Sequence, residues 1–255
     1  MNDIVLIGDG PLAKETSDVF TERGWNVWAM DQLDQPLSSS CAVVDTVTGP
    51  VEEKKRLLRR AVELVPNDAP IWTNTLHVTA TQVASWVPHP ERVGGFSPLM
   101  IKQMPLVEVG RPLQAEDDDV WARAVQLWRY VDKQVEVVGD EPGLVFPRTW
   151  AMLVNEAAFA LTEGVAEADA IDLAMKKGTR FPMGPLEWAD TIGVDQVVWI
   201  LSGLVRELGE DRYRPAPLLR KMVYAGYTGR AAGRGFYRYD VDGKRQSSEI
   251  SKVSI

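Results

Sequence analysis

Short apolar runs alternate with helical patterns along the first half of the chain. The runs are rich in Val and Ile, which favour strands, and we expect strands at residues 4–7, 26–30, 42–45 and 71–73. Between them apolar residues recur every three or four positions, which predicts helices at 11–23 and 51–65. Strands that alternate with helices are typical of a parallel sheet with helices on both faces.

The pattern continues to about residue 142 and then changes. Further strands are expected at 93–96, 106–109 and 134–138, with an amphipathic helix at 117–131. After Gly143 the strand-like runs disappear, and the helical period returns at 150–161, 168–175 and 196–208. The sequence therefore predicts an α/β fold. A doubly wound parallel sheet forms residues 1–142, an all-helical domain follows in residues 143–240, and residues 241–255 form a polar tail.

The composition narrows the class of protein. A chain of 255 residues with 45% apolar residues can fill the cores of two domains. The net charge of −8 disfavours a nucleic-acid surface, which needs a basic stripe. The lone Cys41 and only two histidines argue against a metal site. No apolar run approaches the roughly 18–20 residues of a membrane span. We expect a cytoplasmic protein that binds neither nucleic acid nor membrane.

The first predicted turn carries a dinucleotide motif. The sequence Gly-Asp-Gly-Pro-Leu-Ala at residues 8–13 follows a predicted strand and opens a predicted helix, as G-x-G-x-x-G/A requires. Gly8 permits the tight turn, Gly10 lets a pyrophosphate approach the backbone, and Ala13 allows close helix packing. Asp31, at the end of the next strand, would accept ribose hydroxyls, which indicates NAD in a Rossmann-type domain. The alternative is a structural glycine turn with a solvated aspartate.

Three segments of the second half resemble a known family. Residues 181–190 (FPMGPLEWAD), 213–222 (YRPAPLLRKM) and 229–237 (GRAAGRGFY) are similar to the C-terminal domain of the 3-hydroxyacyl-CoA dehydrogenases. The resemblance spans residues 1–240. It implies an NAD-dependent oxidoreductase that transfers hydride between NAD and a small 3-hydroxy or 3-keto acyl compound, and a homodimer formed through the helical domain. By the same resemblance Lys54 and Asn74 lie near the cofactor's ribose and nicotinamide, although a helix lysine is often only a surface charge.

Several reactive residues of that family are missing here. The family uses a histidine as general base and a glutamate that orients it. Glu108 corresponds to the glutamate, but the region of the histidine reads Gly-Gly-Phe-Ser-Pro at residues 94–98. The family's serine is lost from the shortened turn at 73–77, its asparagine is replaced by Pro147, and its CoA-gripping arm is absent. A missing general base costs roughly 10²- to 10⁴-fold in rate, so the usual reaction should be slow or absent.

Three functions stay open from the sequence. In the first, the protein is a dehydrogenase of altered substrate preference, with His77 as the acid–base group and Glu108 orienting or replacing the base. His89, in an expected surface turn, is the weaker alternative base. In the second, favoured by the combined losses, the chain is a catalytically inactive NAD-binding dimer with a binding or regulatory role. A purely structural dimer with an inert nucleotide site is the third, and the intact glycine motif disfavours it.

Overall fold

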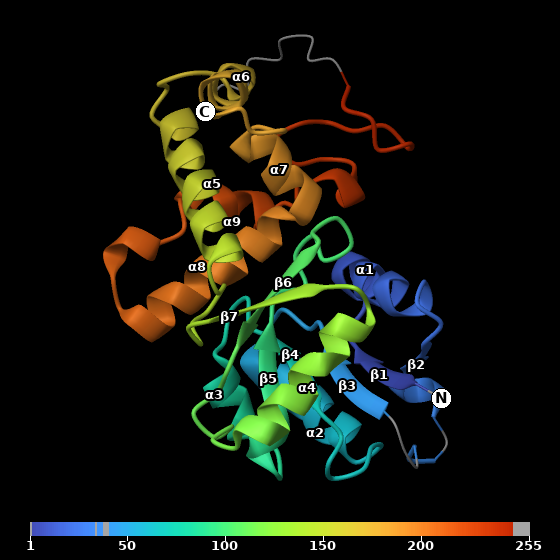
Figure 1. The fold of residues 1–255 in the computed structure, drawn as a ribbon. Helices are drawn as coiled ribbons and strands as arrows, with labels where there is room; N and C mark the ends of the chain where they lie inside the picture. Colours follow the sequence, from blue (N-terminus) through green and yellow to red (C-terminus); the bar gives the residue numbers. More distant parts are fainter. Residues whose placement is uncertain (1, 34, 38–40, 247–255) are drawn as a thin grey trace. The chain divides into compact units, whose positions relative to one another are not determined.

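The chain forms two compact units, and each is described by itself. The structure is a computed structural model that describes residues 2–33, 35–37 and 41–246. The units are Met1–Pro147 and Arg148–Ile255 (Figure 1). Of the polar tail expected at 241–255, residues 247–255 lie outside the described residues.

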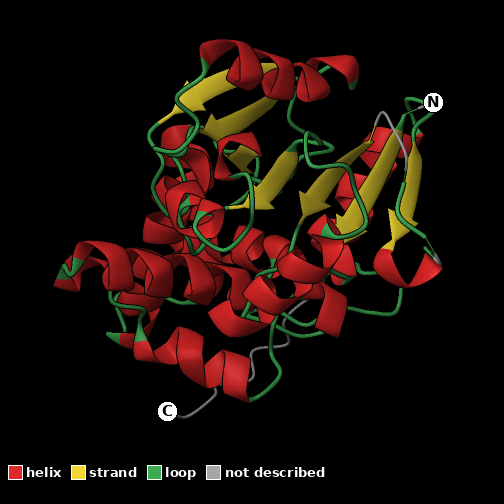
Figure 2. Cartoon of the chain, turned by 90° about the horizontal axis from the view of Figure 1, so that it is seen from below, coloured by secondary structure: helices red, strands yellow, loops and turns green. Residues whose placement is uncertain are grey.

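The first unit is built on one seven-stranded sheet, whose strands are drawn in yellow in Figure 2. The strands lie in the order β2-β1-β3-β4-β5-β6-β7. Their bounds are β1 Asp3–Ile7, β2 Asn26–Ala29, β3 Cys41–Asp45, β4 Ile71–Asn74, β5 Val93–Phe96, β6 Leu106–Gly110 and β7 Gln134–Val138. The helices between them are α1 Gly10–Thr21, α2 Val51–Val62, α3 Ala80–Ala84 and α4 Asp118–Tyr130. The predicted α/β fold is confirmed.

One pair of strands departs from the expected parallel arrangement. Strands β1 to β5 are parallel to one another, β6 pairs antiparallel to β5, and β7 is parallel to β6. The connection between β5 and β6 is residues 97–105. A parallel crossover needs a dozen or more residues, so this short connection returns the chain in the opposite direction.

The two faces of the sheet carry separate apolar clusters. Alternate strand residues point to opposite faces. On one face Ile4, Val44, Trp72 and Phe96 pack with Phe20 of α1 and Trp128 of α4, and the Trp72 and Trp128 ring centroids are 5.5 Å apart. On the other face Val5, Val43 and Ile71 pack with Leu58 of α2 and Val83 of α3. Helices on both faces leave the carboxyl ends of β1 to β5 as the edge where ligands of such sheets bind.

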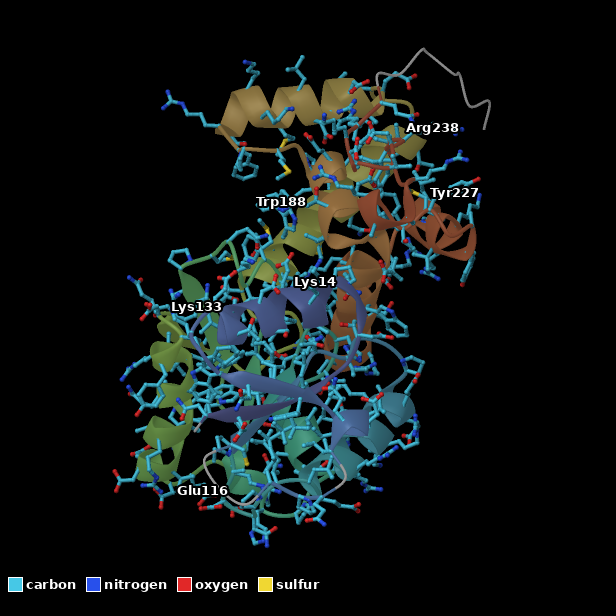
Figure 3. The ribbon with its side chains drawn as sticks, turned by 90° about the vertical axis from the view of Figure 1, so that its right-hand side faces the viewer. Lys14, Glu116, Lys133, Trp188, Tyr227 and Arg238 are labelled. Atoms are coloured by element: carbon cyan, nitrogen blue, oxygen red, sulfur yellow. The ribbon has the colours of Figure 1, made fainter. Side chains whose placement is uncertain are left out.

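The second unit is helical. It contains most of α5 Phe146–Thr162, then α6 Ala168–Thr179, α7 Pro185–Ile192, α8 Val194–Leu208 and α9 Pro217–Tyr224. A C-terminal segment that includes Tyr227 and Arg238 follows α9 (Figure 3). Within the described residues, no helix combines the length and apolar character that a bilayer crossing requires.

Buried carboxylates tie the second unit together. Asp172 of α6 accepts hydrogen bonds from the backbone N–H groups of Leu186 (2.9 Å) and Glu187 (2.8 Å), at the start of α7. Asp190 of α7 accepts from the N–H groups of Phe236 (2.8 Å) and Tyr237 (2.9 Å) in the C-terminal segment. These bonds join segments that are far apart in sequence, so two side chains hold α6, α7 and the C-terminal segment in one packing arrangement.

Candidate functional site

The glycine turn lies at the carboxyl end of β1 and opens α1. The Thr46 hydroxyl donates to the Ile7 carbonyl (2.9 Å), which holds Thr46 against Gly8. A β-carbon at Gly8 would collide with that hydroxyl, and Gly8 has a φ of +112°. Gly8 is therefore required both by the turn and by the close approach of the loop after β3.

The space beside Gly10 is open. An added β-carbon there would meet no atom within 4 Å, and its φ is +75°. The Asp9 side chain makes no capping hydrogen bond to α1, and α1 has no acidic residue in its first turn. Such a helix N-terminus offers backbone N–H groups and a favourable dipole to an anion. An added side chain at Gly10 would fill the space through which a pyrophosphate approaches.

Asp31 and Ala13 complete the predicted motif. Ala13 is buried in α1, where its small side chain permits close packing. Asp31 is exposed and lies in a short 3-10 helix, Met30–Gln32, directly after β2. Since β1 and β2 are parallel, their carboxyl ends meet at the same edge of the sheet. Asp31 and the glycine turn thus share the edge that NAD would occupy, and the residues present fit that cofactor.

Lys54 is buried in an ion pair. Its side chain is 0% exposed, and its Nζ donates to the Asp45 carboxylate (2.5 Å) and to the Val47 carbonyl (3.0 Å). The Thr73 hydroxyl donates to the same carboxylate (2.7 Å). Burial lowers the pKa of Lys54, and the charge of Asp45 opposes that shift. The view of Lys54 as a helix-surface charge is therefore wrong. Its ammonium group is buried and contacts the loop after β3 through the Val47 carbonyl.

Asn74 fixes the same loop from the next strand. Its Nδ2 donates to the carbonyls of Thr46 (3.1 Å) and Val47 (3.3 Å) and to the Thr48 hydroxyl (2.8 Å). Its Oδ1 accepts from the Leu76 N–H (2.9 Å). Asn74 is fully buried. Both Asn74 and Lys54 thus hold residues 46–48, and they shape the carboxyl edge of the sheet beside Gly8.

Glu108 caps the beginning of a helix. Its carboxylate accepts hydrogen bonds from the backbone N–H groups of Val145 (3.0 Å) and Phe146 (3.0 and 3.1 Å), where α5 starts. A carboxylate at that place satisfies N–H groups that have no partner within the helix. Directly after β5, the Ser97 N–H donates to the Glu108 carbonyl (3.4 Å). Residues 94–98, the segment in which the resemblance implies the family's histidine, contain no histidine.

His77 lies inside the first unit. It follows β4 by three residues, and its side chain is 0% exposed. An acid–base group must reach the proton that it transfers, and a wholly buried imidazole reaches a ligand only if the turn opens. The turn is held by Asn74 and by the Thr75 carbonyl, which accepts from the Gly143 N–H (2.7 Å). The other histidine, His89, is half-exposed in a turn at the amino ends of the strands.

The sheet, the glycine turn and the appended helices define a Rossmann-type nucleotide-binding protein with a helical second domain. Residues 37–141 match the NAD binding domain of 3-hydroxyacyl-CoA dehydrogenase, and residues 143–239 match the C-terminal domain of the same enzymes. The chain belongs to the 3-hydroxyacyl-CoA dehydrogenase family, and its first domain is that family's NAD-binding domain.

Relatives support this assignment along most of the chain. The 3-hydroxybutyryl-CoA dehydrogenase of Bradyrhizobium diazoefficiens is 35% identical over 238 residues, covering 91% of this chain and 80% of the relative. A probable 3-hydroxybutyryl-CoA dehydrogenase of Bacillus subtilis is 37% identical over 204 residues, covering 78% of this chain and 69% of the relative. In both relatives the similarity extends across the domain boundary, so the same two domains follow each other in those proteins and in this chain.

Solved structures have the same fold. The (S)-3-hydroxybutyryl-CoA dehydrogenase PaaH1 of Ralstonia eutropha matches with a TM-score of 0.72 and 29% identity, covering 94% of this chain and 91% of that chain. FadB2 of M. tuberculosis matches with a TM-score of 0.80, covering 93% of this chain and 98% of that one. Its 24% identity supports the fold alone.

Proposed function

We propose that the protein is an NAD-dependent oxidoreductase that acts on a small 3-hydroxy or 3-keto acyl compound. The glycine turn carries the proposal, because Gly10 leaves the N-terminus of α1 open, the Asp9 side chain does not cap it, and an anion can approach the backbone N–H groups there. The relatives' names, 3-hydroxybutyryl-CoA dehydrogenases, supply the substrate class. NAD, when bound, supplies the hydride acceptor.

The residues of this chain would bind and orient. The N-terminus of α1 and Gly10 would hold the pyrophosphate, and Asp31 would accept the ribose hydroxyls, which disfavours a 2′-phosphate. Lys54 and Asn74 would act through the loop 46–48, which they fix. Without the helical arm a short thioester or a free acid suits the chain better than a long acyl-CoA. His77 would serve as the acid–base group only after its turn opens.

Cofactor binding can be tested by titrating the protein with NADH. Energy transfer from tryptophan to the reduced nicotinamide should give saturable quenching. Asp31→Ala should weaken binding about tenfold, the loss expected for a charge-assisted hydrogen bond. Asp119→Ala, an exposed carboxylate on α4, is the matched control for the change in charge. Equal NADH affinity in the Asp31→Ala variant and the unchanged protein would exclude this site.

Catalysis needs its own test. Purified protein should reduce NAD with 3-hydroxybutyryl-CoA or with short 3-hydroxy acids, and His77→Ala should remove that activity if His77 is the base. A flat absorbance trace with every substrate, together with intact NADH binding, would overturn the enzymatic function and leave the cofactor site standing.

A second candidate function is a catalytically inactive NAD-binding dimer with a binding or regulatory role. The observation that favours it is that the Glu108 carboxylate accepts from the backbone N–H groups of Val145 and Phe146, a helix-capping role that needs no catalytic partner. We infer that the helical domain forms the homodimer, as in the resemblance above. Size-exclusion chromatography with light scattering should give the mass of a dimer. The mass of a monomer at micromolar concentration would exclude this assembly.

A further inference from the structure

An acidic residue lies in the middle of the glycine turn. Asp9 stands between Gly8 and Gly10, directly before α1. Its backbone is extended, with φ −134° and ψ −177°, so Asp9 occupies the N-cap position of the helix. A carboxylate at that position ordinarily accepts a hydrogen bond from a backbone N–H group of the first turn. The Asp9 side chain accepts none there, and the residue is exposed.

No cation among the described residues forms a salt bridge with Asp9. The salt bridges of α1 join Lys102 to Asp18 and to Glu22, at the other end of the helix. The first basic residue along α1 is Lys14, which is exposed and forms no salt bridge in the described part of the chain (Figure 3). The carboxylate of Asp9 therefore stands beside Gly10 without a paired cation.

The N-terminus of α1 has few donors with which to offset that carboxylate. Pro11 has no backbone N–H, so Gly10, Leu12 and Ala13 are the donors at the start of the helix. A pyrophosphate bound there brings further negative charge to the same turn. Like charges that lie a few ångströms apart at a protein surface repel measurably, even when water screens them. The turn that attracts the pyrophosphate through its N–H groups therefore also repels it through Asp9.

We propose that Asp9 lowers the affinity of this chain for its dinucleotide by opposing the pyrophosphate. Asp31 and Asp9 then act in opposite directions at one edge of the sheet, because Asp31 accepts the ribose hydroxyls and Asp9 repels the phosphates. The inference rests on the proposed function, since it presupposes the NAD site. It also concerns specificity: adenosine, which has the ribose hydroxyls but no phosphate, meets Asp31 without the repulsion from Asp9.

The experiment is a calorimetric titration of the full chain and of Asp9→Asn with NADH, ADP-ribose and adenosine. Asparagine keeps the size of the side chain and is equally suited to the N-cap position. Asp9→Asn should tighten the binding of NADH and ADP-ribose roughly three- to tenfold, as the loss of one charge near a partly screened site would. Adenosine binding should not change. At about 0.5 M salt the gain should fall below about twofold, because the Debye length is then only about 4 Å.

Two further variants separate charge from shape. Asp9→Ala also removes the oxygen that could cap α1, and it should tighten NADH binding as much as Asp9→Asn does, because the effect is one of charge. Asp119→Asn removes an exposed charge on α4 and should leave all three affinities unchanged.

The proposal is overturned if Asp9→Asn binds NADH no more tightly than the unchanged chain, or if adenosine gains as much affinity as NADH. NADH binding that weakens in Asp31→Ala but stays the same in Asp9→Asn would overturn this inference and keep the NAD site. If the unchanged chain and both Asp9 variants fail to bind NADH, the proposed function fails together with the inference.

Discussion

Both units contain buried carboxylates that join segments distant in sequence, but the groups that stabilise the carboxylate charge differ between the two units. In the first unit Asp45 has a cation, the Nζ of Lys54, besides its hydrogen-bond donors. In the second unit Asp172 and Asp190 accept only from N–H and O–H groups, and neither forms a salt bridge within the described residues. Of the two carboxylates in the second unit, Asp190 has a raised pKa because of its burial. The stability of the first unit should therefore depend on the Lys54–Asp45 ion pair, and the stability of the second on pH through Asp190.

The largest effect is expected from breaking the ion pair. Lys54→Met leaves the Asp45 carboxylate buried without its cation, and the free energy of unfolding should fall by about 3–5 kcal/mol in urea titrations. Lys55→Met, a partly exposed neighbour on α2, should change it by less than about 0.5 kcal/mol. The double variant Lys54→Met/Asp45→Asn should recover part of the loss. Equal stability of the Lys54→Met and Lys55→Met variants would contradict the assigned pair.

The second unit should respond to pH through Asp190. Burial raises the pKa of Asp190 to about 6, and the nearby charge of Asp172 acts in the same direction, while three hydrogen bonds oppose it. Its folded-state pKa lies above its unfolded value, so the folded chain binds the extra proton between about pH 4 and 6. The stability from this group is present below the unfolded value and is lost as the pH rises through 6, by roughly 3 kcal/mol at most.

The measurement is a difference between two proteins. Unfolding of the unchanged chain and of Asp190→Asn is followed from pH 4 to pH 7, and the stability of the unchanged chain relative to the variant should fall across that range. Other carboxylates titrate in both proteins and cancel. A difference that does not vary with pH would show that Asp190 titrates as in the unfolded chain.

Local patterns were enough to predict the strands and the glycine turn, since both are encoded by neighbouring residues. The direction of β6 depends on the length of one connection, and the pattern of β6 itself carries no sign of it. Lys54 stands in the run Glu-Glu-Lys-Lys-Arg at residues 52–56, which reads as a solvated helix face. Its partner Asp45 lies at the end of β3, in a different element, so the burial of Lys54 could not be foreseen from the helical pattern. Glu108 was found from the family, but its partners are backbone N–H groups, which leave no mark in a sequence.

A smaller effect should come from one phenol in the second unit. The Tyr237 hydroxyl donates to the Asp172 carboxylate (2.7 Å) in a buried polar cluster formed by Asp172, Asp190, Tyr237 and Tyr239. Tyr237→Phe removes that donor and should cost about 1–2 kcal/mol of the free energy of unfolding. Tyr227→Phe is the matched control, because the Tyr227 ring stacks on Arg234 and its hydroxyl is not used in the cluster. If both variants lose the same stability, the Asp172 bond contributes nothing specific.

The smallest stability change is expected at Glu108, where it separates two roles. As a helix cap, Glu108→Gln keeps the shape and one acceptor oxygen and loses the charge at the N-terminus of α5, at a cost of about 0.5–1 kcal/mol. Glu116→Gln, an exposed glutamate, controls for the loss of a charge. In a protein that turns over, a cap leaves kcat nearly unchanged, whereas a carboxylate that orients or replaces the base lowers kcat by roughly 10²-fold or more. A large fall in kcat with unchanged stability would show that Glu108 takes part in catalysis. Its bonds to the Val145 and Phe146 N–H groups would then position the carboxylate and would not be its main role.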